Sequence, residues 1–248
     1  MSLGRLLGLI CLVLGLASLL LLPSESARAA RGHHASSSSK ATHHHRYHHF
    51  RGCRLQHPQL FLERRHFVRH GQLLDGRFKR ALAYRVKHYG SVPGIGLDKL
   101  NPMSAISQAE NTTFMGLPIR VHKKIVPALR CVERRIKKVC RSRHNRYTPH
   151  AVGGFRTRNT YHHGEVSNHL FGIAVDIDPS RNPCCHCVKP WPDNPICKKD
   201  AKSVYDKTSL PRCWVHAFER YGFYWLGRDE LQDTMHFEFL GNPDRIVP

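Results

Sequence analysis

Eight cysteines between residues 53 and 213 constrain this chain more than any other feature of its sequence. An even number of cysteines predicts a disulfide framework if the chain is exported to an oxidising compartment. Eight cysteines can pair fully in 105 ways. One pairing is disfavoured, because Cys131 and Cys140 lie on one predicted helix. The rise of that helix separates them by roughly 13 Å, which is beyond the reach of a disulfide.

The N-terminus of the sequence predicts export. Arg5 precedes an unbroken apolar run over residues 6–22, and residues 27–29 read Ala-Arg-Ala, as at a signal-peptidase site. We expect residues 1–29 to be a signal peptide and the mature protein to be secreted or periplasmic, in the cell envelope. The alternative is an uncleaved anchor, because the run is near the lower length limit for a membrane span. After signal cleavage the sequence predicts no stable membrane span.

The charge of the chain predicts a polyanionic partner. Lys+Arg 39 against Asp+Glu 18 gives a formal charge of +21, and a field of that sign attracts polyanions. Because export makes nucleic acid an improbable partner, we expect anionic envelope polymers to contact the basic surface. A hydrophobic fraction of 41% and a charged fraction of 23% exclude a wholly disordered polyelectrolyte.

Three segments follow the predicted signal peptide. Residues 30–50 are rich in His and Ser and predict a flexible linker, whose histidines either collect zinc or nickel or serve as plain spacer. Residues 51–111 predict a helical N-terminal extension, with a helix from about 61 to 89 whose apolar face is Phe78, Leu82, Val86 and Tyr89. Residues 112–248 carry the motifs described below.

The fold class predicted for the chain is α+β. A second helical stripe covers residues 125–139, and its opposite charged face is either simply solvated or an envelope-binding patch. Strand-like runs follow at 151–155, 172–177, 223–226 and 235–240, with a short helix before the last two. This order predicts a small, largely antiparallel sheet with flanking helices. Residues 179–211 predict a disulfide-stapled loop, although its run Cys184-Cys185-His186-Cys187, with Cys197 beyond, would alternatively suit structural zinc.

Two segments place polar residues where strands would bury apolar ones. The first contains His169 and Asp176, and the second contains Asp233 and His236. If the two strands lie side by side, His169, Asp176 and His236 converge on one patch. Two imidazoles and a carboxylate form a three-ligand Zn2+ site that leaves one position for water. Asp233 would then serve as a general base for that water.

The sequence around these residues resembles a family of zinc peptidases. Residues 167–176 match its S-x-H-x-x-G-x-A-x-D motif, residues 154–157 are similar to its Gly-Tyr-Arg-Ser motif, and residues 235–238 are similar to its closing His-Phe-Glu. The family contains D-Ala-D-Ala carboxypeptidases of the VanY type and endolysins that cleave L-Ala-D-Glu bonds, with a hedgehog/DD-peptidase fold. The resemblance implies that residues 112–248 form a zinc peptidase domain, which would cut peptidoglycan stem peptides.

The resemblance also implies a role for each site residue. His169, Asp176 and His236 would be the zinc ligands, Asp233 the catalytic carboxylate, and Arg156 would hold a substrate carboxylate or the developing oxyanion. Many family members have glutamate where this chain has Asp233, which leaves open the choice between carboxypeptidase and endopeptidase. His162 and His163 match no motif and are expected at the surface, while Ser167 and Glu238 either orient ligands or simply fill hydrogen bonds.

Two other functions compete with a peptidase. The signalling domain of hedgehog proteins has a similar fold and metal site without this activity, so a non-catalytic zinc module is one alternative. A basic envelope-binding module with a vestigial metal site is another. Asp233 and Arg156 favour catalysis, because a purely structural metal site requires neither.

Overall fold

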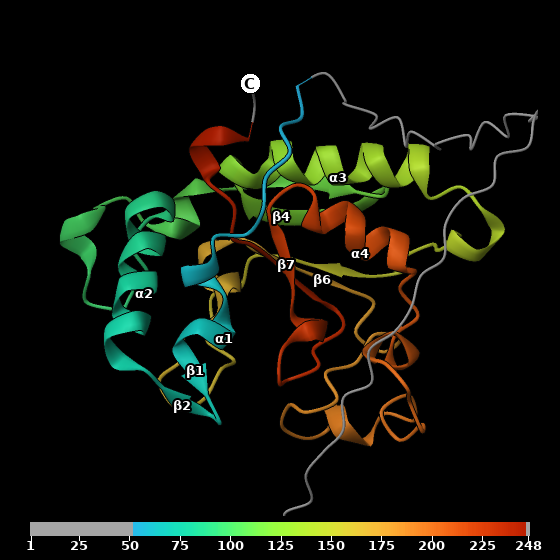
Figure 1. Ribbon diagram of the computed structural model, residues 1–248. Helices are drawn as coiled ribbons and strands as arrows, with labels where there is room; N and C mark the ends of the chain where they lie inside the picture. Colours follow the sequence, from blue (N-terminus) through green and yellow to red (C-terminus); the bar gives the residue numbers. More distant parts are fainter. Residues whose placement is uncertain (1–51, 247–248) are drawn as a thin grey trace, which may run out of the picture. The chain divides into compact units, whose positions relative to one another are not determined.

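A four-stranded antiparallel sheet lies at the centre of residues 52–246, the part of the chain that this computed structural model describes (Figure 1). Its strand order is β5-β6-β8-β7. The strands are β5 (Val152–Gly153), β6 (Ala174–Ile177), β7 (Phe223–Trp225) and β8 (His236–Phe239). All three pairings are antiparallel. The predicted α+β class with a small antiparallel sheet is therefore confirmed.

Two hairpins and four helices complete the regular structure of the described residues (Figure 1). The hairpins pair β1 (Val68–Arg69) with β2 (Gln72–Leu73), and β3 (Ala109–Phe114) with β4 (Leu117–His122). The helices are α1 (Arg64–Phe67), α2 (Asp75–Tyr89), α3 (Val126–Val139) and α4 (Arg212–Glu219). Short 3-10 turns connect many of these elements.

The predicted helix over residues 61–89 is wrong in its first half. The β1–β2 hairpin interrupts it, because His70 and Gly71 both adopt positive φ angles, 49° and 73°, and reverse the chain. The second half is helix α2, and its predicted apolar face is buried. Gly90 ends α2 at φ 100°, where a Cβ atom would lie 2.5 Å from the Met103 carbonyl oxygen.

The predicted stripe of the second helix matches α3 except at its end. Leu129, Val132 and Ile136 are buried, whereas Val139 is 39% exposed. The β3–β4 hairpin just before α3 was not predicted, because only Phe114 of β3 is buried and the strand lacks a regular apolar alternation. β4 does alternate, with Leu117, Ile119 and Val121 apolar and the last two buried, so the weak pattern of β3 is what conceals the strand pair.

Aromatic packing fixes the apolar side of the central sheet. Phe218 of α4 stacks on Phe237 of β8 with ring centroids 4.1 Å apart, and Phe237 and Phe239 are both fully buried. Because alternate residues of a strand face opposite sides, His236 and Glu238 point the other way. They are buried as well, at 3% exposure each, so the polar side of β8 also lies inside the protein.

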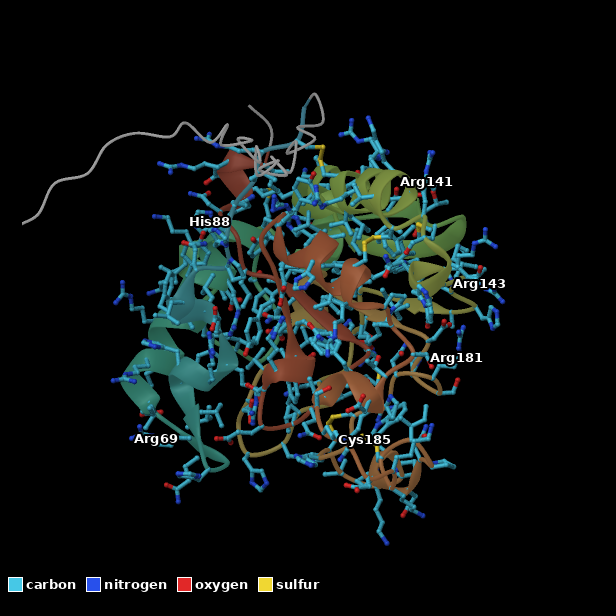
Figure 2. All side chains as sticks on the ribbon, turned by 45° about the vertical axis from the view of Figure 1, so that its right-hand side comes forward. Arg69, His88, Arg141, Arg143, Arg181 and Cys185 are labelled. Carbon is cyan, nitrogen blue, oxygen red and sulfur yellow. A yellow bond between two sulfur atoms is a disulfide. The ribbon has the colours of Figure 1, made fainter. Side chains whose placement is uncertain are left out.

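All eight described cysteines form disulfides, which Figure 2 shows as yellow bonds. Cys53–Cys131 and Cys140–Cys213 link segments that are 78 and 73 residues apart, and Cys131 and Cys140 avoid each other as predicted. Cys184–Cys187 and Cys185–Cys197 staple the predicted loop. The alternative of structural zinc on these four cysteines is wrong for this oxidised form, because their sulfur atoms are already bonded in pairs.

Two predicted segments lie outside the described residues: the signal peptide over 1–29 and the linker over 30–50. Between residues 52 and 246, none of the helices has the length and apolar character that a bilayer crossing requires.

His122, at the end of β4, is a buried imidazole. Its Nδ1 atom accepts a hydrogen bond of 3.1 Å from the backbone N–H of Lys124, and its ring meets the edge of Tyr89 at 5.2 Å. Burial, reinforced by the charge of Lys124, lowers the pKa of His122 to about 4. In the unfolded chain the same group has a pKa of about 6.5.

We predict that His122 makes the fold acid-sensitive. Its contribution to stability is fully present above pH 6.5 and is lost as the pH falls towards 4, because only the unfolded chain then binds the proton. The loss is at most about 3 kcal/mol. His122→Asn keeps an acceptor for the Lys124 N–H and should reduce the decrease in urea-unfolding free energy between pH 7.5 and pH 4.5. The control His216→Asn, at an exposed position, should leave that decrease as large as in the unmodified protein. Identical pH dependences for all three proteins would contradict this role.

Candidate metal centre

Local structure explains the residue types that surround His169. Ser167 precedes the 3-10 turn Asn168–Phe171, and its Oγ atom accepts a hydrogen bond of 3.3 Å from the His169 N–H. Gly172 ends the turn at φ 68°, and a Cβ atom there would lie 2.7 Å from the backbone nitrogen of His122. Ser167 caps the start of the turn, and Gly172 adopts the left-handed backbone conformation that ends it. Both residues thereby help to orient His169.

The strand register brings Asp176 and His236 together. Asp176 of β6 is paired directly with His236 of β8, and Ala174 is paired with Glu238. Side chains of directly opposed residues in an antiparallel pair lie on the same side of the sheet, a few ångströms apart. The small side chain of Ala174 leaves room beside Glu238. A shift of the register by one residue would move His236 and Glu238 to the other side.

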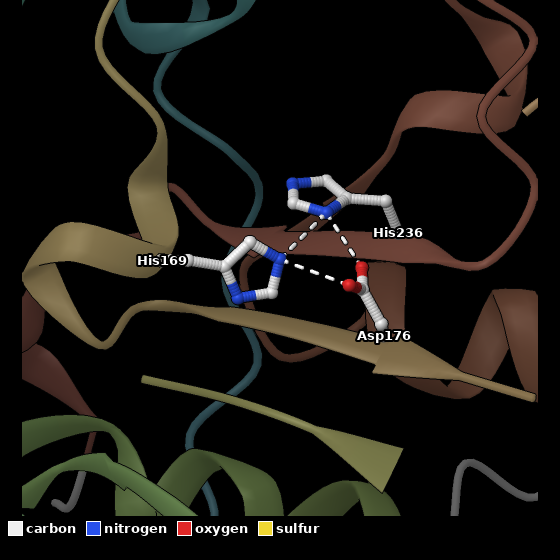
Figure 3. Close-up of side chains that lie close together, drawn as sticks. All are labelled: His169, Asp176 and His236. Carbon is white, nitrogen blue, oxygen red and sulfur yellow. Dashed lines mark hydrogen bonds and ion pairs between the residues drawn. The ribbon is translucent and has the colours of Figure 1, made fainter. Parts of the chain in front are cut away.

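His169, Asp176 and His236 form a compact group of donor atoms (Figure 3). His169 Nε2 lies 3.2 Å from His236 Nδ1 and 3.2 Å from Asp176 Oδ2, and His236 Nδ1 lies 2.8 Å from Asp176 Oδ1. Donors bound tetrahedrally at 2.0–2.1 Å from one ion are about 3.3 Å apart. The three side chains therefore fit a Zn2+ ion with little adjustment.

Each histidine is held from its far side. The Nδ1 atom of His169 lies 2.5 Å from the Gly154 carbonyl oxygen, which leaves Nε2 to face the group. The Nε2 atom of His236 lies 3.1 Å from Glu238 Oε1, which leaves Nδ1 to face it. Such outer contacts fix the ring orientation and the tautomer of metal-binding histidines. Glu238, whose role the sequence left open, thus orients His236.

The electrostatics of the group favour a cation. Burial lowers the pKa of His169 despite the charge of Asp176, so this imidazole is neutral and has a lone pair to donate. Burial also opposes a charge on His236, but hydrogen bonds with Asp176 and Glu238 outweigh it and raise its pKa to about 10. The carboxylates that favour a proton on His236 would equally favour a bound divalent ion.

Asp233 and Arg156 line the same cavity as the three donors, which has a volume of about 470 Å3. Asp233 is 8% exposed, and burial raises its pKa to about 7. Arg156 contacts Asp176 through Nη2, and its side chain is 38% exposed. All five residues that the sequence singled out therefore lie at one cavity. His162 and His163 are exposed, as expected of surface residues, and they also line this cavity.

An ion cluster that the sequence did not reveal lies beside this cavity, and two of its members, Arg64 and Glu165, line it. Arg64 of α1 contacts both carboxylate oxygens of Glu165 at 2.8 Å and Asp229 Oδ1 at 2.7 Å. The side chains of the three residues are at most 10% exposed. Their separations along the chain, 101 and 165 residues, explain why no local pattern shows them. Arg64 thereby ties α1 to the segments that precede His169 and Asp233.

The family comparison agrees with this geometry. Residues 161–239 match the family model described as D-alanyl-D-alanine carboxypeptidase. This match supports membership of that peptidase family. It covers about a third of the chain and includes His169, Asp176, Asp233 and His236, whereas Arg156 and Arg64 lie outside it. Searches of curated proteins and of solved structures gave no match.

Peptidases of this family are zinc-dependent, so we predict about one tightly bound zinc ion per chain. His169→Ala should abolish the tight binding, because it removes one of only three protein donors. Glu238→Gln should weaken it by roughly 10–100-fold, because the orienting carboxylate is lost while all donors remain. Zinc content after dialysis against graded chelator measures both. The control His144→Ala, at an exposed position, should retain zinc. Full zinc retention by His169→Ala would exclude this site.

We further predict that the Arg64 cluster supports the fold. Arg64→Met leaves Glu165 and Asp229 buried without their cation and should reduce the free energy of unfolding by about 3–5 kcal/mol. Lys79→Met breaks a pair with Asp75 in which both side chains are more than 70% exposed, and should cost about 1 kcal/mol or less. Urea unfolding measures both variants. Equal effects would show that the buried cluster contributes no more than a surface pair.

Proposed function

We propose that the protein is an exported zinc metallopeptidase that hydrolyses peptide bonds in peptidoglycan stem peptides. The family match supports a peptidase that acts on peptidoglycan at this coarse level. The observation that carries the finer proposal is the buried carboxylate of Asp233, with one unpaired oxygen, beside a metal-competent donor group. The Oδ1 atom of Asp233 is buried without a hydrogen-bond partner among the described residues, which a purely structural metal site would not require.

The residues around the cavity support a hydrolytic mechanism. A zinc ion held by His169, Asp176 and His236 would polarise the scissile carbonyl and acidify a water molecule. Asp233 would accept a proton from the attacking water and deliver it to the leaving amine. Burial places the pKa of Asp233 at about 7 in the metal-free protein, so both protonation states are accessible near neutral pH. A nearby cation would shift that pKa downwards.

Arg156 is the candidate substrate-binding residue. Its guanidinium projects from the segment after β5, is partly exposed, and lies at the cavity beside Asp176. A guanidinium binds a carboxylate through two parallel hydrogen bonds. It would hold either the terminal carboxylate of a stem peptide or the oxyanion that develops on the scissile carbonyl. Binding of the terminal carboxylate fits a D-Ala-D-Ala carboxypeptidase. Binding of the oxyanion fits either a D-Ala-D-Ala carboxypeptidase or an L-Ala-D-Glu endopeptidase.

The basic surface supports a location in the envelope. Figure 2 shows Arg141 and Arg143 pointing outward on one side of the described unit, and both are exposed. They follow the charged face of α3, which carries Arg130, Arg134, Lys137 and Lys138. We propose that this surface contacts anionic wall polymers and keeps the peptidase near its substrate, because opposite charges raise the local concentration of a polymeric partner.

Digestion of purified peptidoglycan, with mass analysis of the released fragments, tests the proposal. Release of D-alanine would identify a carboxypeptidase, and cleavage between the first two stem residues would identify an endopeptidase. Asp233→Asn should retain zinc but slow hydrolysis by roughly 10²–10⁴-fold, because the proton acceptor is lost. The control Asp193→Asn, at an exposed position, should retain activity. Unchanged turnover in Asp233→Asn would remove this residue from the mechanism. Salt-sensitive binding without any turnover would instead favour the non-catalytic envelope-binding module.

A further inference from the structure

The disulfide Cys184–Cys187 forms part of the cavity wall next to Asp233. The two cysteines have the Cys-x-x-Cys spacing, and both line the cavity that contains the metal centre. Their sulfur atoms and a carboxylate oxygen of Asp233 all lie within 4.8 Å of one another. Cys-x-x-Cys is also the spacing with which two thiolates hold one zinc ion. If the two cysteines were reduced, the carboxylate of Asp233 would therefore lie close enough to serve as a third ligand to the same metal ion.

Backbone contacts hold the cysteine loop against the segment of Asp233 independently of the disulfide. The backbones of Cys184 and Asp233 pair as an isolated antiparallel β-bridge, and the N–H of Cys185 donates to the Gln232 carbonyl at 3.2 Å. On the other side of the bridge, the N–H of Thr234 donates to the Pro183 carbonyl at 3.2 Å. These hydrogen bonds would keep the three side chains together after the sulfur–sulfur bond is broken.

The carboxylate of Asp233 is available as a ligand. It is buried, and its Oδ1 atom has no hydrogen-bond partner among residues 52–246. Unpaired buried carboxylate oxygens are unfavourable, and a cation would relieve that cost. Cys187 is only half-buried and faces the cavity, so a small reductant and a metal ion can both reach the disulfide from the substrate side.

We propose that reduction of Cys184–Cys187 creates a second metal site, whose protein ligands are the two cysteine thiolates and Asp233. A dithiol reductant breaks the sulfur–sulfur bond, is itself oxidised to a cyclic disulfide, and leaves two cysteine thiols. Binding of a divalent ion then releases one proton from each thiol. Two soft thiolates with one carboxylate select zinc, cadmium or cobalt rather than calcium or magnesium. A water molecule would complete four-coordination.

This second site would compete with hydrolysis, a consequence that rests on the proposed function. An Asp233 carboxylate bound to a metal ion cannot accept a proton from water. Metal ions would therefore inhibit the reduced peptidase and leave the oxidised one active. The metal site itself does not depend on catalysis, because its ligands and their distances are the same whether or not the protein hydrolyses a peptide.

Cobalt(II) absorption distinguishes the two sites. His169, Asp176 and His236 provide no sulfur, so a thiolate-to-cobalt charge-transfer band in the near ultraviolet can arise only from cysteine ligands. The mature chain would first be saturated with zinc, then treated with a water-soluble phosphine, which reduces the disulfide and is oxidised to its oxide with oxygen from water. We expect about one further cobalt ion per chain with this band after reduction, and no band before reduction.

Variants assign the ligands. Cys185→Ser/Cys197→Ser removes the neighbouring disulfide and should retain the band, whereas Cys184→Ser/Cys187→Ser should lose it. Asp233→Asn leaves all disulfides in place during folding and should weaken cobalt binding by roughly tenfold or more, since even an outer partner of a ligand is worth that much. Persistence of the band without Cys184 and Cys187, or unchanged affinity in Asp233→Asn, would overturn the proposal. Metal inhibition of the reduced chain is a separate measurement, so an inactive protein that shows the band would contradict only the proposed function.

Discussion

The antiparallel pairing of β6 with β8 is the constraint on which the candidate site depends. It places Asp176 directly opposite His236 and Ala174 opposite Glu238, so that one donor pair and its orienting carboxylate come from three strand positions. His169 joins them from the 3-10 turn just before β6. A strand register can change only in whole residues, and each single step reverses the side of every side chain. The site therefore exists in one register of this sheet and in no neighbouring one.

Burial gives that arrangement its chemical character. The three donors, Asp233 and Glu238 are all at most 8% exposed. The opposite face of the central sheet is packed with aromatic rings. In such surroundings charges are costly unless they are paired. The result is a neutral His169, a His236 whose protonated form is stabilised by two carboxylates, and an Asp233 whose pKa is raised to about 7. A divalent cation is the partner that would satisfy this excess of buried acceptors.

Segments outside the metal-binding motifs take part in the same cavity. Arg64, which lies far before residue 161, bridges Glu165 and Asp229 across the cavity wall. The Cys184–Cys187 disulfide packs beside Asp233 from the opposite loop. The Arg64 contacts act on the segments that precede His169 and Asp233, and the cysteine loop acts on the segment of Asp233. The N-terminal helices and the stapled loop are thus part of the architecture of the site as well as of the fold.

The sequence by itself determined what depends on local spacing: the buried faces of α2 and α3, the strands around Asp176 and His236, and the candidate donors with their motif glycine and serine. It failed where local patterns are silent. The turn at His70 and Gly71 divides a helix that periodicity extends through it, and β3, which buries only Phe114, lacks the alternation that would reveal the β3–β4 hairpin. Only the tertiary structure decided the cysteine pairs, the Arg64 cluster and the contact of Glu238 with His236. These depend on which distant segments meet and in what register, and that is set by the packing of the whole core rather than by any one stretch of chain.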